Sequence, residues 1–166
     1  MPDNPSPPLA TLRQHRPDDL AWVVDAHGRL YAAEYGWNDD FRRLVADIMA
    51  TFERNFDPAR ECCFIAEQGG ARLGCAFVAA KDARTAQLRC VLLEPQARGQ
   101  RLGSRLVDAC IDFAREAGYA DMVLWTNDCL HAARAIYQRA GFELESQETH
   151  HSFGHDLVGQ YWRLKL

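Results

Sequence analysis

A basic, glycine-containing turn between a strand and a helix is the part of this sequence best suited to chemistry. The segment AQLRCVLLEPQARGQRLGS carries an apolar strand that ends at Glu94-Pro95 and a helix that begins near Leu102. A helix's first turn leaves four backbone N–H groups without intrahelical partners and carries a positive dipole end. Formal charge at the same place comes from three arginines, Arg98, Arg101 and Arg105. The pattern predicts a phosphate-binding turn.

Two better-known phosphate motifs do not fit this turn. It lacks the Gly-Lys-Ser/Thr of a nucleotide P-loop and the G-x-G-x-x-G of a dinucleotide fold. Gly99 and Gly103 would let the backbone approach a ligand closely. The alternative is an ordinary helix N-terminus with surface arginines.

A histidine-rich run near the C-terminus is the second candidate for chemistry. His150, His151, His155 and Asp156 surround Gly154, in what we expect to be the loop between the last two strands. Such a set could bind zinc, but we predict no metal site. We expect the run to shape a substrate pocket or a contact between two copies of the chain, with a histidine as a possible base.

The elements that must position these residues alternate in a mixed α/β (α+β) pattern. The order is β-α-α-β-β-β-α-β-α-β-β, which predicts a mixed, mostly antiparallel sheet with helices on both faces and no Rossmann repeat. Residues 1–10 form a proline-rich tail that we expect to be disordered, and residues 11–166 form one domain. We expect Asp18 to cap the first helix and Asn38 or Asp39 the second. The expected elements after those helices are strands at 62–67, 72–81 and 86–93, a helix from 102, a strand at 122–126, a helix at 131–140, and strands at 142–149 and 160–166. Trp125 and Trp162 are predicted core residues.

Composition narrows the class of protein. The net charge is −4 and no basic block is present, which argues against a nucleic-acid partner. No apolar run reaches the roughly 18 residues of a membrane helix, and no signal-peptide pattern is seen, so we expect no membrane partner and a cytoplasmic location. The six cysteines are expected to be reduced, mostly buried hydrophobes.

Two motifs together resemble the GCN5-related N-acetyltransferase (GNAT) family. Arg98–Ser104, after a strand that ends in Glu-Pro, resembles the family's R-x-x-G-x-G/A signature, and Ala133–Phe142 resembles its A-x-x-x-Y-x-x-x-G-F run. From about residue 11 onward the chain is more closely similar to the acetyltransferase domain fused behind MarR-type winged-helix regulators. The segments LYAAEYGW, LWTNDCLHAARAIY and HHSFGHDLVGQYW carry that similarity.

The resemblance implies acetyl-CoA as the acyl donor, with no metal. It assigns the pyrophosphate to the turn residues Arg98, Gly99, Gln100, Arg101, Leu102, Gly103 and Ser104. It assigns the pantetheine to the strand residues Val91, Leu92 and Leu93, with a backbone N–H near Leu93 polarising the thioester carbonyl. The family usually has glycine where this chain has Arg101. Because helical backbone angles do not require glycine, we expect that amide still to donate.

The resemblance assigns the general acid of the reaction to a definite residue, but it leaves the general base open. Tyr137 corresponds to the family's general acid, with aromatic packing as the alternative role. The family's asparagine seven residues earlier is replaced by Leu130, and Asn127 can substitute as a cofactor-binding residue. The strand before the last helix has no glutamate, so Glu34 is the leading base candidate, acting through a water, and a solvated surface charge is its alternative.

The resulting prediction is an N-acetyltransferase in which a primary amine attacks acetyl-CoA directly within a ternary complex. The acceptor, a small molecule, amino acid or peptide amine, is expected to contact Tyr31, Tyr35, Trp37, His150, His151 and His155. The resemblance also suggests a homodimer. The rival prediction is a non-catalytic acyl-CoA sensor or regulatory partner.

Overall fold

A computed structural model describes residues 9–166 and has the element order predicted from the sequence. The elements are β1 (Thr11–Gln14), α1 (Asp19–Tyr35), α2 (Asp39–Asn55), β2 (Cys62–Gln68), β3 (Ala71–Ala80), β4 (Thr85–Leu93), a 3-10 turn (Pro95–Ala97), α3 (Leu102–Glu116), β5 (Asp121–Asn127), α4 (His131–Ala140), β6 (Glu143–Ser152) and β7 (His155–Lys165). Residues 1–8 of the predicted tail lie outside the described part. Ala10, which we assigned to that tail, is buried in the core.

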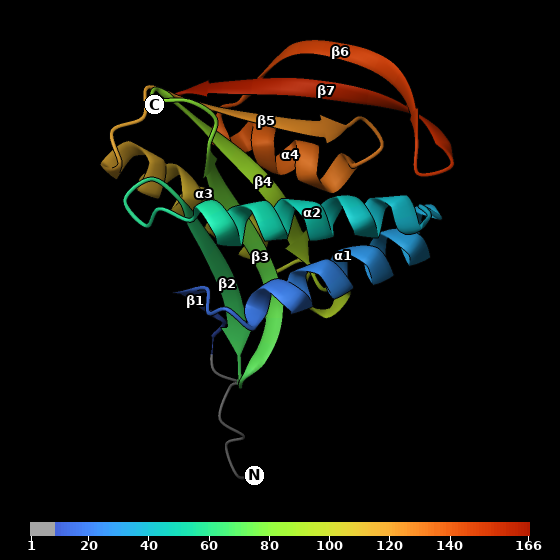
Figure 1. Cartoon of the computed structure of the whole chain (residues 1–166), viewed down its shortest axis with the longest axis horizontal. Helices are drawn as coiled ribbons and strands as arrows, with labels where there is room; N and C mark the ends of the chain where they lie inside the picture. The colour runs from blue at the N-terminus through green and yellow to red at the C-terminus, as the bar shows by residue number, and fades with distance from the viewer. Residues whose placement is uncertain (1–8) are drawn as a thin grey trace, which may run out of the picture.

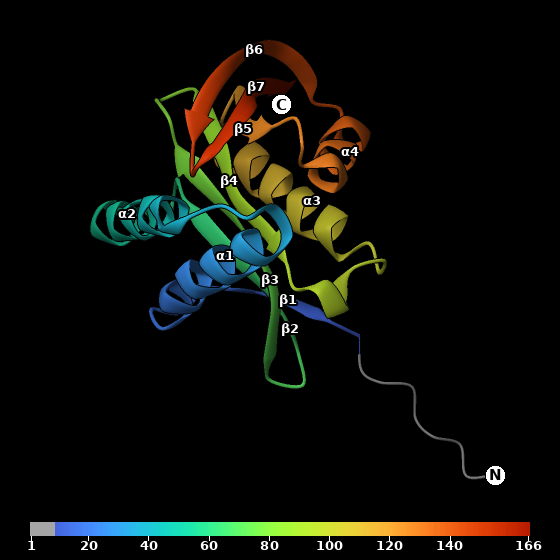
Figure 2. The same cartoon turned by 90° about the vertical axis from the view of Figure 1, so that its right-hand side faces the viewer.

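The strands form one seven-stranded sheet in the order β1-β2-β3-β4-β5-β7-β6. The pair β4–β5 is parallel, and the other neighbouring pairs are antiparallel. Helices α1 and α2 cover one face, and α3 and α4 cover the other (Figures 1 and 2). Each face has its own apolar core, with buried residues such as Phe77 on the α1–α2 side and Leu106 on the α3 side. The mixed α/β sheet with helices on both faces is therefore confirmed.

The centre of the sheet opens between β4 and β5. The two strands pair only from Thr85 to Leu88, opposite Asp121 to Leu124, and then diverge. A bulge interrupts the pairing of β4 with β3, and Cys90 within it takes a φ of 52°, a left-handed conformation that is unusual outside glycine. From Arg89 to Leu93, the β5-facing edge of β4 is unpaired in the described chain. This opening gives the molecule its cleft.

The closing hairpin is longer than the sequence predicted. The expected loop around Gly154 is wrong, because β6 runs to Ser152, β7 begins at His155, and only Phe153 and Gly154 form the turn. Both turn residues have positive φ, 58° and 83°, as a tight hairpin turn of this twist requires. The histidines thus lie on strands. Strand β6 is polar and almost wholly exposed, so its hydrophobic pattern could not reveal its length.

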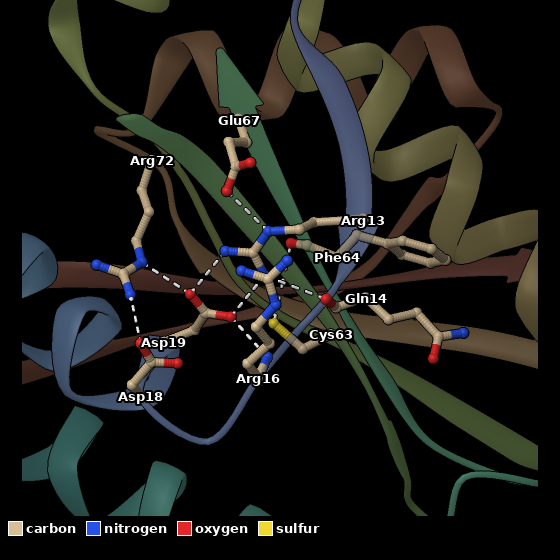
Figure 3. Close-up of polar contacts among 9 residues, drawn as sticks. All are labelled: Arg13, Gln14, Arg16, Asp18, Asp19, Cys63, Phe64, Glu67 and Arg72. Carbon is tan, nitrogen blue, oxygen red and sulfur yellow. Dashed lines mark hydrogen bonds and ion pairs between the residues drawn. The ribbon is translucent and has the colours of Figure 1, made fainter. Parts of the chain in front are cut away.

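A charge cluster around the buried Asp19 lies at the start of α1, at the end of the sheet remote from this hairpin (Figures 1 and 3). The fully buried Asp19 carboxylate accepts from Arg13 and Arg72, both at 2.7 Å, and from the Arg16 N–H at 2.6 Å. Burial alone would raise the pKa of Asp19, but these hydrogen bonds outweigh it and hold that pKa well below its usual range. Asp18, the predicted cap, makes no side-chain capping bond; that prediction is wrong. Asn38 does cap α2, through the N–H of Asp40.

Candidate active site

The cleft between β4 and β5 consists of two adjoining cavities. The turn-side cavity, about 170 Å³, lies next to the Arg98 turn and is also lined by Glu34, Tyr35 and Ile136. The hairpin-side cavity, about 290 Å³, lies next to the β6–β7 hairpin. The two cavities share four of their lining residues, Tyr31, Val91, Leu130 and Ala133. A ligand lying along the unpaired edge of β4 could therefore pass from one cavity into the other.

The turn before α3 has backbone geometry that the sequence did not predict. Arg101 has φ 57° and ψ 18°, so the expectation of ordinary helical angles there is wrong. The left-handed conformation costs an L-residue roughly 1–2 kcal/mol and explains why glycine suits this position. Gly99 is also left-handed, with φ 81°, and its missing side chain leaves open space. The turn is therefore an exposed, strained loop.

The remaining turn residues divide between ligand-facing and core positions. Arg98 and Gly103 line the turn-side cavity, together with the strand residues Val91, Leu92 and Leu93. A Cβ at Gly103 would lie 2.7 Å from Ile136 Cδ1 and 3.2 Å from Leu93 Cδ1, so packing between α3, α4 and β4 itself requires glycine. Leu102 is buried in the core, and Gln100 and Ser104 do not line either cavity. Those three could reach a ligand mainly through backbone groups.

Glu34 is engaged by the arginine of the turn. Its Oε1 accepts from Arg98 NH2 at 2.6 Å, and both side chains line the turn-side cavity. Tyr35, expected to contact the acceptor, lies in this same cavity, and neither residue lines the hairpin-side cavity. The structure therefore brings Glu34 and Tyr35 to the cavity beside the Arg98 turn, and not to the cavity that Tyr137 lines.

Two tyrosines line the cleft, Tyr137 buried and Tyr31 partly buried. Tyr31, on α1, lines both cavities, and Tyr137, on α4, lines the hairpin-side cavity and packs edge-on against Phe142. Burial raises the pKa of both phenols well above the usual value, and the neighbouring groups raise it further. Both hydroxyls therefore stay protonated at neutral pH. A protonated phenol in such a position can donate a proton or a hydrogen bond.

The three predicted histidines have three different partners. His150 Nε2 lies 2.8 Å from Asn127 Oδ1, and its Nδ1 lies 2.8 Å from Ser152 Oγ. Asn127 lines the hairpin-side cavity, so His150 acts on that cavity through it. His151 pairs at the surface with Asp156, and His155 Nε2 contacts the Gly36 carbonyl at 3.0 Å. Within the described residues, no cluster of three or more His, Cys, Asp or Glu is placed to hold a metal ion.

Aromatic side chains form the walls of the hairpin-side cavity. Trp37 is buried and stacks against Phe153, whose ring centroid is 4.9 Å away, and the Asn38 N–H donates to the Phe153 carbonyl at 3.1 Å. These contacts tie the hairpin tip to the α1–α2 connection. Trp125 also lines this cavity and is 37% exposed, so its prediction as a core residue is wrong, whereas Trp162 is buried. Gly159 leaves room for the Trp125 ring, which would lie 2.6 Å from an added Cβ.

The lining of the hairpin-side cavity includes residues that were not predicted as site residues, among them His27, Arg89, Cys90 and Phe153. His27 sits on the apolar stripe of α1, and its buried Nε2 has no partner in the described chain. Burial lowers the pKa of His27 to about 4, and its hydrogen bond to Val23 only partly offsets this. The positive φ of Cys90 depends on the bulge, which no local signal announces. Of these residues, only Phe153 has a local sequence signal: a Phe-Gly pair between two polar strands is typical of a tight hairpin turn and places Phe153 at its tip.

The cleft thus combines a splayed sheet, a helix turn suited to an anion at one end and the buried phenol of Tyr137 at the other. The family model described as Acetyltransferase (GNAT) family matches residues 24–142, and the chain belongs to that family. It is accordingly an acetyl-CoA-dependent acyltransferase with acetyl-CoA as cosubstrate. The unpaired β4 edge, the exposed turn amides and Arg98 form a set of donors that suits that cosubstrate.

Curated relatives and solved structures agree with the family. An uncharacterised N-acetyltransferase of Schizosaccharomyces pombe is 29% identical over 90% of this chain and 88% of its own length. N-acetyltransferase family 8 member 7 of Mus musculus is 28% identical over 74% of this chain, which spans only 56% of that relative. A putative acetyltransferase of Salmonella typhimurium, solved with acetyl-CoA, has the same fold, with a TM-score of 0.76 and 20% identity. The match covers 96% of this chain and 95% of that one. None of the helices in residues 9–166 has the length and apolarity needed to span a bilayer.

Proposed function

We propose that this chain transfers the acetyl group of acetyl-CoA to a primary amine by direct attack within a ternary complex. The observation that supports it best is the continuous cleft, in which the phosphate turn and Tyr137 lie in adjoining cavities that share four lining residues. A donor on the turn side and an acceptor on the hairpin side would meet at the bulge of β4. Proximity of this kind can supply much of the rate enhancement.

In the proposed reaction the amine nitrogen forms a bond to the thioester carbon, and the carbon–sulfur bond breaks. Tyr137 gives its proton to the departing thiolate and recovers one from the substituted nitrogen, so protons balance overall. The raised pKa of Tyr137 keeps it in the protonated state that this role needs. Val91, Leu92 and Leu93 are proposed to contact the pantetheine, and the turn amides the pyrophosphate.

The base role of Glu34 receives little support from its surroundings. Its carboxylate is held by Arg98 at the turn side of the cleft. We propose instead that Glu34 positions Arg98, and that Asn127, supported by His150, orients the acceptor. An amine that arrives neutral then needs no dedicated base. The cytoplasmic location, the homodimer and the closer similarity to domains fused to MarR-type regulators stay predictions.

The test is release of free thiol from acetyl-CoA across a panel of amines, with the product identified by mass. An N-acetylated product supports the proposal. Binding of acetyl-CoA without thiol release from any amine would favour the sensor role and contradict the proposal.

A further inference from the structure

Arg89 is a charged side chain that lines the cleft. It lies on β4 one residue before the bulged Cys90, and it lines both the hairpin-side cavity and a neighbouring groove along α2. Its guanidinium makes no hydrogen bond or ion pair with any residue in the described range. Two other arginines close to the cleft are paired, Arg98 with Glu34 at 2.6 Å and Arg29 with Glu94 at 2.7 Å. A half-buried guanidinium without a partner is suited to receive an anion.

The other residues that line the hairpin-side cavity indicate that this anion belongs to the acceptor substrate. Among the described residues lining it, Arg89 carries the only formal charge at neutral pH, and none is acidic. An acceptor with several positive charges, such as a polyamine, would find no carboxylate there. The aromatic side chains of Trp37, Trp125 and Phe153 instead offer walls for an apolar group.

Arg89 is also at the right distance from the reacting centre. Two residues of chain span at most about 7 Å, so the backbone of Arg89 lies within that distance of Val91, which lines both cavities. An α-amino acid carries its amine one carbon away from its carboxylate. Arg89 could therefore hold the carboxylate while the amine stays within reach of the bulge.

We infer that the acceptor is an amino acid with an apolar or aromatic side chain, and that Arg89 binds its carboxylate. This inference rests on the proposed function, since it names the class of amine that the same cleft acetylates. A planar guanidinium can bind a carboxylate through two parallel hydrogen bonds, which a lysine cannot do. Arg89 is thus a specificity-determining residue.

The experiment compares each amino acid with its own amide as acceptor, using phenylalanine, leucine and methionine. Thiol release gives kcat/KM for each member of a pair, with wild type, Arg89→Gln and Arg89→Lys. The control is Arg139→Gln, which removes an exposed arginine on α4 that lines neither cavity. The amide's amine is less basic and more often neutral, so intrinsic reactivity works against the predicted preference.

The expected result is a preference of wild type for the acid on the order of 100-fold, as for loss of a charge-assisted contact. In Arg89→Gln that preference should fall to within about threefold, with an intermediate value in Arg89→Lys and no change in Arg139→Gln. A merely structural role would slow acid and amide equally, which would overturn the inference. Equal use of acid and amide by wild type would also overturn it while leaving amine acetylation intact. If no amine releases thiol although acetyl-CoA raises the melting temperature, the proposed function fails, and the inference with it.

Discussion

The two cavities of the cleft are built on opposite principles. The turn-side cavity combines mostly apolar walls with one charge pair, Arg98 held by Glu34, beside a turn that has left-handed residues at 99 and 101. The hairpin-side cavity is walled largely by aromatic side chains from five helices and strands, α1, α2, α4, β5 and β7, and its one arginine is unpaired among the described residues. The first suits a ligand that is common to a whole family. The second suits a ligand that differs from member to member, because its walls come from surface elements that can change independently.

The largest expected effect is on kcat, from replacing Tyr137, the proposed acid, while acetyl-CoA binding is retained. Tyr137→Phe should lower kcat by about 10²–10³-fold, because it removes the acid that protonates the thiolate, while acetyl-CoA affinity stays within about twofold. Steady-state rates and calorimetric titration with acetyl-CoA measure the two quantities. Because the pKa of Tyr137 lies above the usual value of about 10, its deprotonation should cause no loss of rate below that pH.

Tyr31→Phe is the matched control for that variant. Tyr31 is a second, partly buried phenol in the same cleft with a raised pKa, and we assign it no proton transfer. Its replacement should change kcat by less than about tenfold. If the two variants lose activity equally, the assignment of Tyr137 as the acid is wrong.

An intermediate effect is expected from the charged pair of the turn-side cavity. Arg98→Gln should weaken acetyl-CoA binding by about tenfold and leave acceptor preference unchanged, because Arg98 does not line the hairpin-side cavity. Glu34→Gln should also change acetyl-CoA affinity but keep kcat within about threefold. A loss of kcat beyond tenfold in Glu34→Gln, with acetyl-CoA affinity unchanged, would restore Glu34 as the base.

The smallest expected effect concerns the strained turn. Arg101→Gly should stabilise the protein by about 1 kcal/mol, because glycine adopts φ 57° without the cost that arginine incurs. For a chain of this size that corresponds to roughly 2–4 °C in melting temperature. Acetyl-CoA binding should strengthen slightly or stay the same. A lower melting temperature would show that the Arg101 side chain contributes more than its backbone strain costs.

The contrast between the cavities also explains what the sequence could predict. Local signals were sufficient for α4, predicted at residues 131–140 and found there, and for the Asn38 cap of α2. The left-handed Arg101, the bulge at Cys90 and the splay after Leu88 depend on packing between distant strands, so no local pattern showed them. The apolar strand around Trp125 predicts a core position for it. Its exposure follows from β5 diverging from β4, which only the three-dimensional structure reveals.

Cys90 gives the account its most direct test, because it is the thiol that lies in the hairpin-side cavity beside the bulge. Burial raises the pKa of Cys90 to about 11, so only roughly one molecule in a few thousand would carry the thiolate near pH 7.5. The decisive measurement is initial-rate kinetics with acetyl-CoA and the best amine both varied, on wild type and Cys90→Ala. Direct transfer predicts intersecting lines in double-reciprocal plots of the initial rates for both proteins. It also predicts a kcat for Cys90→Ala within a few-fold of wild type. Parallel lines, an acetylated Cys90 in the mass spectrum and an inactive Cys90→Ala would contradict it.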